Sequence, residues 1–405
     1  MLTIQKEWVA MLLFSTGILL IYVGMLNPWF MWPLGRAYLL ASAALLLCSL
    51  LISNTMEESL FTGRYITPPL VAYVVLSIYI ALAGKSLMAI VGIVFRLVPI
   101  ALLLTLRYDR LRWMINFIAR CMGLLLAVSL GAFFLHLAGF AFPNAPAHFE
   151  DTNYYYTNYY FFMISDSAAN MLLPRFSSVF LEPGHIGTAA VMLLMTQCGR
   201  WKKWYNIIFI ATAVLSFSLE AYVLLFLLFF LNLWLQRRHV VAKFLGVIVL
   251  MATVVAGSFV YNDGDNTLNN LIILRLEVED GDIAGNNRVT EQFDDDFNDL
   301  MHSTDVLFGR DFDYEYCSGY KVFIYENGLV GLVLLFVFYA LLLARTNNRR
   351  ALFVGFVIVF LDFIVRAHSL WFSVLVPFYF MACGFSDLNP AKQEKYNAQN
   401  FVALS

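Results

Sequence analysis

One stretch of the chain, residues 174–188, places a cation, a carboxylate and an imidazole where a polar segment meets an apolar run. Arg175 carries a planar guanidinium that holds phosphate or pyrophosphate through paired hydrogen bonds and keeps its charge at physiological pH. Glu182 and His185 are three residues apart, and each is a candidate general base. A structural interpretation is equally open, with Arg175 and Glu182 as an ion pair and His185 as a hydrogen-bonded residue of a helix bundle.

The residues after Glu182 predict how this stretch folds. Proline is favoured at the first position of a helix, so Pro183-Gly184 predicts a helix start with Glu182 at or before the N-cap. A helix N-terminus that points into a cavity favours an anion. The stretch therefore groups a cation, a possible base and oriented backbone N–H groups.

A second group of candidate residues closes an acidic segment, 262–320. The segment has fifteen Asp and Glu residues against three arginines, among them Arg288 and Arg310. These arginines either pair with the acids or are kept for an anionic substrate. Asp313 and Glu315 are candidate general bases, because carboxylates near an apolar surface have raised pKa values. The acids lack the spacing of a calcium-binding EF-hand, and we expect no metal site.

The composition indicates a polytopic α-helical membrane protein. Hydrophobic residues make up 61% of the chain and charged residues 13%, about half the charged fraction of a soluble protein. A helical crossing takes roughly 20 apolar residues, which predicts about twelve transmembrane helices. The expected spans are 8–26, 34–53, 67–84, 86–106, 113–141, 177–199, 204–218, 220–236, 241–261, 321–344, 351–366 and 369–385. We therefore expect an all-α fold, with residues 1–405 forming a single integral membrane domain.

The positions of Lys and Arg predict the topology. The runs 204–236 and 351–385 are too long for one helix, and we divide them at the polar breaks 216–218 and 366–369. With a cytoplasmic N-terminus, most basic residues then fall in cytoplasmic loops, as is usual for membrane proteins. Both termini are expected to be cytoplasmic, and the large loops 142–176 and 262–320 are expected to be periplasmic.

The loop 142–176 has Tyr or Phe at seven of the nine positions from 154 to 162. Two interpretations are open. Aromatic residues form belts at membrane interfaces, and they also form surfaces that stack on sugars or contact lipid.

Polar residues inside the expected spans need partners or a wet cavity, because charge is costly in a bilayer. Asp362 and Arg366 are four residues apart on one expected helix, and we expect them to pair. Arg366 should nevertheless lie at the outer face, level with Arg175. His136, alone in an apolar run, is expected to be a hydrogen-bonded core residue.

Four segments, in order along residues 170–335, resemble motifs of Wzy-type polysaccharide polymerases and the related O-antigen ligases. They are Arg175-Phe176-Ser177-Ser178-x-Phe180-x-Glu182-Pro183-Gly184; Ser216-x-Ser218-x-x-Ala221-Tyr222; Asn287-Arg288 followed by Leu307-Phe308-Gly309; and Ser318-Gly319-Tyr320 through Glu326-x-Gly328-x-x-Gly331. Their order along the chain and the hydropathy of the whole chain make the resemblance specific.

The resemblance implies a GT-C-like membrane glycosyltransferase of the bacterial inner membrane, acting at the periplasmic face without metal or cofactor. Its donor would be a glycan on undecaprenyl pyrophosphate, and its acceptor another lipid-linked repeat unit. A chain-length regulator and a repeat-unit flippase are the implied protein partners, and no nucleic acid is expected. The expected site residues are Glu182, His185, Asp313 and Glu315 as candidate bases, with Arg175, Arg288, Arg310, Arg366 and Tyr320 as substrate ligands.

Two other functions stay open. A ligase would move the glycan onto a different acceptor, but the ligases often have a histidine near position 318, where this chain has Cys317-Ser318. A transporter or flippase is the rival from another class, although we find no repeated halves of the kind that transporters usually show.

Overall fold

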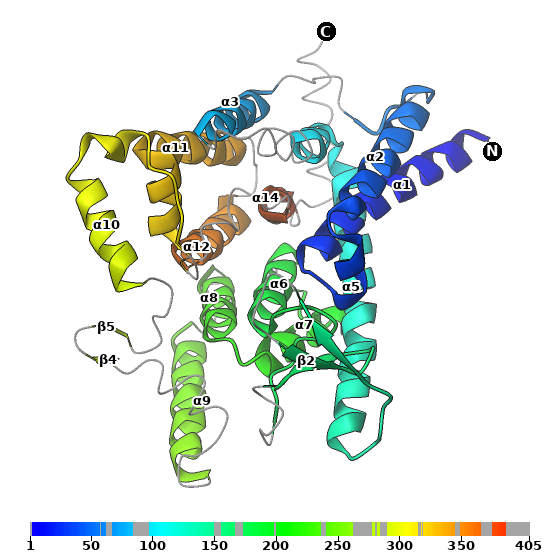
Figure 1. Cartoon of the computed structure of the whole chain (residues 1–405). Coiled ribbons are helices and arrows are strands. Elements are labelled where there is room, and N and C mark those ends of the chain that lie inside the picture. The colour runs from blue at the N-terminus through cyan, green and yellow to red at the C-terminus, as the bar shows by residue number, and fades with distance from the viewer. Residues whose placement is uncertain are drawn as a thin grey trace.

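The structure, a computed structural model, is mostly helical (Figure 1). It describes residues 2–56, 58–61, 67–83, 97–149, 155–166, 173–197, 200–235, 240–261, 278–279, 282–283, 290–314, 317, 319–344, 349–365 and 375–385. The helices are α1 (Leu2–Met25), η1 (Trp29–Leu34), α2 (Ala37–Asn54), α3 (Pro68–Ala83), α5 (Tyr108–Leu137), α6 (Pro183–Thr196), α7 (Trp204–Leu215), α8 (Leu219–Leu235), α9 (Val240–Val260), α10 (Glu291–Met301), η6 (Thr304–Leu307), α11 (Tyr320–Ala344), α12 (Arg349–Val365) and α14 (Leu375–Phe385). Residues 97–105 are also helical.

The apolar helices indicate a membrane-embedded protein. Among the described residues, four helices are long and apolar enough to cross a bilayer: Lys6–Met25, Ala37–Asn54, Asp109–Leu137 and Tyr320–Ala344. Several shorter apolar helices accompany them. Helix α7 has 12 residues, so it is about 18 Å long, well short of the roughly 30 Å hydrocarbon core. The predicted division of 204–236 at residues 216–218 is confirmed, because α7 and α8 flank it.

The expectation of an all-α fold is wrong for the loop 142–176. Strands β1 (Ala145–His148), β2 (Tyr155–Asn158) and β3 (Met163–Ser165) form an antiparallel sheet in that order. A second pair, β4 (Val278–Glu279) and β5 (Asp282–Ile283), lies in the acidic loop. The aromatic run supplies β2, since aromatic side chains suit a pleated, half-buried surface.

The aromatic residues of this loop are divided between burial and exposure. Tyr156 is buried beside Trp32, whereas Tyr160 and Phe161 are exposed. The His136 ring lies 4.5 Å from that of Tyr159 and 5.4 Å from that of Phe162, but His136 is only half-buried, so it packs on aromatic rings without being the core residue that was expected.

Small residues let α1 and α2 pack closely. Ser42 Oγ donates to the Gly17 carbonyl at 2.9 Å, and Ser49 Oγ donates to that of Ala10 at 2.7 Å. Such contacts are typical of helix pairs in membranes, where backbones approach through Gly, Ala and Ser.

The acidic loop contributes a helix that packs on the bundle. Helix α10 begins after Thr290, whose hydroxyl accepts a hydrogen bond from the Phe293 backbone N–H at 3.3 Å. Its apolar face buries Phe293, Phe297 and Leu300 against the start of α11. The helix thus brings residues 291–301 of the acidic loop onto the bundle.

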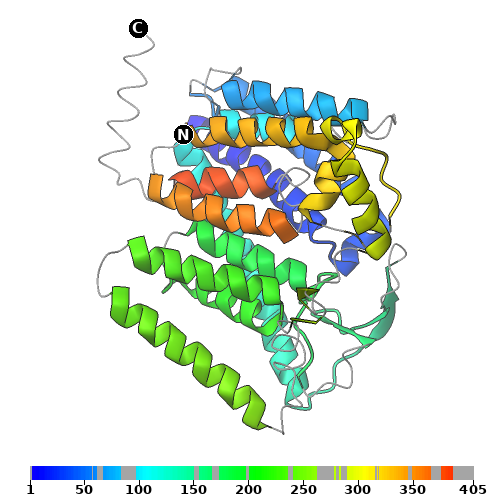
Figure 2. The same ribbon diagram turned by 90° about the vertical axis from the view of Figure 1, so that its left-hand side faces the viewer.

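The sheet and α10 lie at the same end of the bundle, and the start of α1 lies at the other end (Figure 2). Helix α8 packs against α12, and α12 packs against α11. In Figure 1, α12 stands between α8 and α11.

Candidate functional site

Four of the described site residues fall in two places, Arg175, Glu182 and His185 in one and Arg310 in the other, whereas Asp313 and Tyr320 lie in neither. One is the α6 junction, defined as residues 174–188 with residues 212–222. The other is the α11 junction, defined as residues 303–310 with residues 323–331 and Tyr79. Three predicted site residues, Arg288, Glu315 and Arg366, lie outside the described residues. The expected Asp362–Arg366 pair lies outside them too, because it includes Arg366.

The first part of the α6 junction is a non-helical segment that hydrogen bonds hold to two other parts of the chain. The Phe176 N–H donates to the Leu215 carbonyl at 2.9 Å. Met163, the first residue of β3, donates its N–H to the Ser178 carbonyl at 2.8 Å. The side chains of Phe176 and Phe180 are fully buried and anchor the segment. The predicted span 177–199 is therefore wrong in its first residues, because these long-range bonds hold them outside the helix, which starts at Pro183.

Arg175 caps the C-terminus of α7. Its Nε donates to the Ser216 carbonyl at 3.1 Å, where the helix dipole favours a cation. Other bonds use the last carbonyls of α7, including one of 2.5 Å from the Tyr222 hydroxyl to the Val214 carbonyl. Arg175 also acts electrostatically on the Tyr222 hydroxyl. Nε is one of the five guanidinium N–H donors, and this cap fixes the position of the side chain.

Glu182 is the N-cap residue of α6, as predicted, with extended backbone angles and Pro183 at the helix start. Its side chain makes no cap hydrogen bond. Instead, Glu182 Oε2 lies 3.5 Å from His185 Nε2. Both side chains are partly exposed, at 37% for Glu182 and 27% for His185. A carboxylate beside an imidazole orients it and stabilises its protonated form, which is the arrangement of a general base with its orienting group.

Two motifs that are distant in sequence meet at Gly187. A Cβ at this position would lie 2.4 Å from Ser216 Oγ and 3.0 Å from Ala221 Cβ. Only glycine allows α6 to approach the break between α7 and α8 this closely. The segment around Arg175 and the segment around Ser216 therefore form one packed unit.

The α6 junction contains strained backbone and unsatisfied polar atoms. Ser178 and Phe217 have φ angles of 55° and 45°, a region that L-residues other than glycine rarely adopt. The buried hydroxyls of Ser178 and Thr188 have no hydrogen-bond partner among the described residues. Strain and unpaired buried polar groups cluster at functional sites, so these residues mark the junction as a candidate site.

The α11 junction is built on glycines. Gly328 has φ 63° and ψ −177° and kinks α11. A Cβ there would lie 2.3 Å from the Leu307 carbonyl oxygen, and a Cβ on Gly309 (φ 84°) would lie 2.6 Å from the backbone of Glu326. The kink exposes carbonyls that find new donors, since Arg310 N–H binds the Tyr325 carbonyl at 2.6 Å. Here too, two motif segments pack together.

Arg310 is bound by the acidic segment. Its Nε donates to Asp305 Oδ2 at 2.9 Å, and its Nη2 donates to Ser303 Oγ at 3.1 Å. The hydrogen bond with Asp305 raises the pKa of Arg310. Two roles were considered for the arginines of the loop 262–320, pairing with its acids or binding an anionic substrate. In the structure Arg310 pairs with an acid, Asp305. Asp313 and Tyr320 are exposed.

Comparison with known proteins finds no relatives: no family model matches the chain, and no curated protein or solved structure is similar to it. The chemistry of the site therefore stands on its own residues. In the described part of the chain, no three His, Cys, Asp or Glu side chains gather as metal ligands.

Several residues of the α6 junction were not predicted as site residues. Ser178 and Phe217 stand out because their φ angles are positive, and their residue types do not predict such angles. Tyr222 and Thr188 contribute hydroxyls. One signal was available for this region, because the polar break at 216–218 in an apolar run is followed by Tyr222.

Proposed function

We propose that the protein is a membrane glycosyltransferase that polymerises lipid-linked oligosaccharide repeat units. The observation that carries this proposal is the α6 junction. Two segments that resemble polymerase motifs pack on one another there, and Arg175 lies at their contact. The proposal includes about twelve crossings of the membrane, a GT-C-like fold, cytoplasmic termini and a site that faces the periplasm of the inner membrane.

The donor is a glycan on undecaprenyl pyrophosphate, and Arg175 binds the pyrophosphate. When the bond from the anomeric carbon to the pyrophosphate oxygen breaks, negative charge develops on the leaving group. A fixed guanidinium at that position stabilises the transition state more than the ground state. The cap on α7 holds Arg175 in place, which removes the cost of ordering it during the reaction.

The acceptor is the sugar terminus of a second lipid-linked repeat. Its hydroxyl attacks the anomeric carbon, and its proton passes to His185, which Glu182 orients. The products are a glycan longer by the transferred block and free undecaprenyl pyrophosphate. Asp313 is a weaker candidate for the base, because it is exposed and lies beside the α11 junction rather than in the α6 junction.

The test is a bacterial strain from which the gene for this chain is deleted. A polymerase defect leaves single lipid-linked repeats on the outer leaflet, and the native chain restores the long glycan. Single repeats confined to the inner leaflet would identify a flippase. Long glycans that stay on the lipid carrier would identify a ligase. Either of these two results contradicts the proposal.

A further inference from the structure

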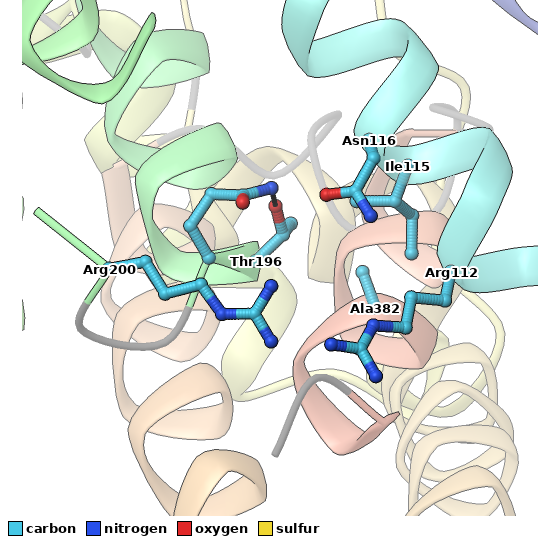
Figure 3. A pocket seen from close by; sticks show the side chains of 7 residues that line it. Arg112, Ile115, Asn116, Thr196, Arg200 and Ala382 are labelled. Atoms are coloured by element: carbon cyan, nitrogen blue, oxygen red, sulfur yellow. Dashed lines mark hydrogen bonds between the residues drawn. The ribbon is translucent and has the colours of Figure 1, made fainter. Parts of the chain in front are cut away.

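A small polar pocket lies where α6 ends, between α6, α5 and α14. Arg112, Thr196 and Arg200 are among the residues that line it (Figure 3). Its volume is about 10 Å³, which leaves room for about one water molecule and no ligand. An apolar surface lies at the other end of the bundle, where α6 begins.

This surface is a cluster of aromatic side chains, which we call the aromatic patch. It consists of Trp29 and Phe30 of η1, Phe140 and Phe142 after α5, and Tyr160 and Phe161 of the turn between β2 and β3. The side chains of Phe30, Phe140 and Phe161 are 44%, 59% and 48% exposed. Exposed apolar surface of this kind marks contact with a membrane or a partner.

Ring contacts make the patch continuous. The Trp29 ring lies 5.8 Å from the rings of both Phe30 and Tyr160. On the other side, the Phe142 ring lies 5.0 Å from that of Phe140 and 6.4 Å from that of Phe161. Three segments that are distant in sequence therefore present one aromatic surface.

The turn between β2 and β3 holds two of these rings outward. Tyr160 has φ 66°, an angle that residues other than glycine rarely adopt. Its N–H donates to the Oδ1 of the buried Asn158 at 2.8 Å, and its carbonyl accepts a bond of 3.2 Å from Trp29 Nε1. The rings are thus fixed in exposed positions by the fold of the turn.

The aromatic patch lies where three apolar helices end. The 3-10 helix η1 joins the end of α1 to the start of α2, and Phe140 follows the end of α5. All three helices are long and apolar enough to cross a bilayer. Their ends at this side mark the boundary between hydrocarbon and water, where aromatic side chains are enriched.

Charge distinguishes the two ends of the sheet. The segments that carry the patch, residues 27–35, 138–147 and 155–165, contain no Asp, Glu, Lys or Arg. The connection between β1 and β2 contains Glu150 and Asp151. It belongs to the other end of the sheet, where His148 pairs with Tyr155. At about 3.3 Å per residue, β2 separates the two ends by about 10 Å.

We propose that the aromatic patch inserts into the headgroup region of the lipid leaflet at this end of the bundle, while the other end of the sheet stays in water. Phe30, Phe140 and Phe161 supply apolar rings, and Trp29 adds an amphipathic ring that suits an interface. A sugar would need hydrogen-bonding groups beside the rings, and phenylalanine side chains have none. The inference requires only a membrane-embedded chain and is independent of the proposed glycosyl transfer.

Insertion of the patch also sets the depth of the α6 junction. The Met163 N–H donates to the Ser178 carbonyl at 2.8 Å, and the Trp29 N–H donates to the Val179 carbonyl at 3.0 Å. The turn and η1 are therefore both bonded to the segment that follows Arg175. This segment is held close to the level of the lipid headgroups.

The test measures the depth of single spin labels on the full-length chain in phosphatidylcholine vesicles. The five native cysteines are replaced by alanine, and the labels are attached to Phe161→Cys, Phe30→Cys or His148→Cys chains that keep the melting temperature of the native chain. Oxygen concentrates in the bilayer, whereas a charged nickel chelate stays in water. The reagent that relaxes a label more strongly therefore shows whether the label lies in lipid or in water.

We expect oxygen to relax the labels at positions 161 and 30 more strongly than the nickel chelate does. The label at position 148 is the matched control, because it is on an exposed residue of the same sheet, and we expect the reverse order there. A label at position 161 or 30 that behaves like the control would overturn the inference, and so would a control label that lies in lipid. A label at position 161 that lies in water and is shielded by added oligosaccharide would identify a sugar-binding surface instead.

Discussion

The α6 and α11 junctions have similar components, but only the α6 junction has backbone strain. Each packs two distant motif segments, and each contains an arginine. In the α11 junction the positive φ angles belong to Gly309 and Gly328, which adopt them without strain. In the α6 junction the positive φ angles belong to Ser178 and Phe217. A positive φ costs a residue other than glycine about 1–2 kcal/mol of folding free energy.

The two junctions also differ in how their polar groups are satisfied. Arg310 is bound by Asp305 and Ser303, and the Tyr79 hydroxyl donates to the Asn327 carbonyl at 2.7 Å. In the α6 junction, by contrast, buried hydroxyls lack partners among the described residues. A region kept for stability has no reason to retain strain and unpaired groups. We infer that the α11 junction is a framework and that the α6 junction carries the chemistry.

The largest expected effect is a loss of stability caused by a substitution in the α11 junction. Gly328→Ala puts a Cβ about 2.3 Å from a backbone oxygen and forces alanine to φ 63°. We expect a loss of about 4 kcal/mol of stability, seen as a lower melting temperature and a smaller folded fraction after purification.

The matched control is Gly131→Ala on α5, where no atom lies within 4 Å of the new Cβ. Alanine favours a helix over glycine by about 1 kcal/mol, so this variant should be neutral or more stable. Equal melting temperatures for the Gly328→Ala and native chains would contradict the described kink.

A smaller effect is expected for Gly187→Ala in the α6 junction. The new Cβ meets the Ser216 hydroxyl at 2.4 Å, a side-chain atom that can turn aside. We expect a net loss of about 1–2 kcal/mol after the gain in helix propensity. Adding Ser216→Ala should recover part of this loss, and strictly additive changes would show that the two residues do not touch.

Ser178→Gly should separate stability from activity. Glycine adopts φ 55° without strain, so we expect this variant to be more stable by about 1 kcal/mol. Polymer yield should fall, because the hydroxyl is lost from the site. Ser177→Gly is the comparison, since it removes the bond of 3.0 Å from Ser177 Oγ to the Met163 carbonyl and should only destabilise. Unchanged polymer yield in Ser178→Gly would show that Ser178 has no part in the reaction.

The smallest effect is expected for Arg310→Ala. The side chains of Arg310 and Asp305 are 33% and 53% exposed, and exposed ion pairs contribute little. The melting temperature should change only slightly, and that change should shrink as salt screens the pair. A large, salt-independent loss would mean that Arg310 is more than a surface partner of Asp305.

Local features of the chain were predictable, and long-range ones were not. Pro183 predicted the start of α6, and the polar residues at 216–218 predicted the break between α7 and α8, because both signals act within a few residues. The sheet is an exception, because its three strands pair within residues 145–165 and are therefore local. It was missed because the aromatic run was interpreted as an interfacial belt or a contact surface and not as a strand. The cap from Arg175 to Ser216 joins residues 41 positions apart, and no spacing rule predicts such a bond.

The central claim is that Arg175 in the α6 junction carries the polymerisation. The most direct measurement compares Arg175→Lys with Arg310→Lys in the deletion strain, using the chain-length ladder of surface polysaccharide at equal protein level. Lysine keeps the charge and a donor for the Ser216 carbonyl, but it loses the planar fork that binds pyrophosphate. We expect Arg175→Lys to reduce long-chain glycan by about 100-fold and Arg310→Lys to leave the ladder intact. A normal ladder in Arg175→Lys, or loss of the ladder only in Arg310→Lys, would contradict the account.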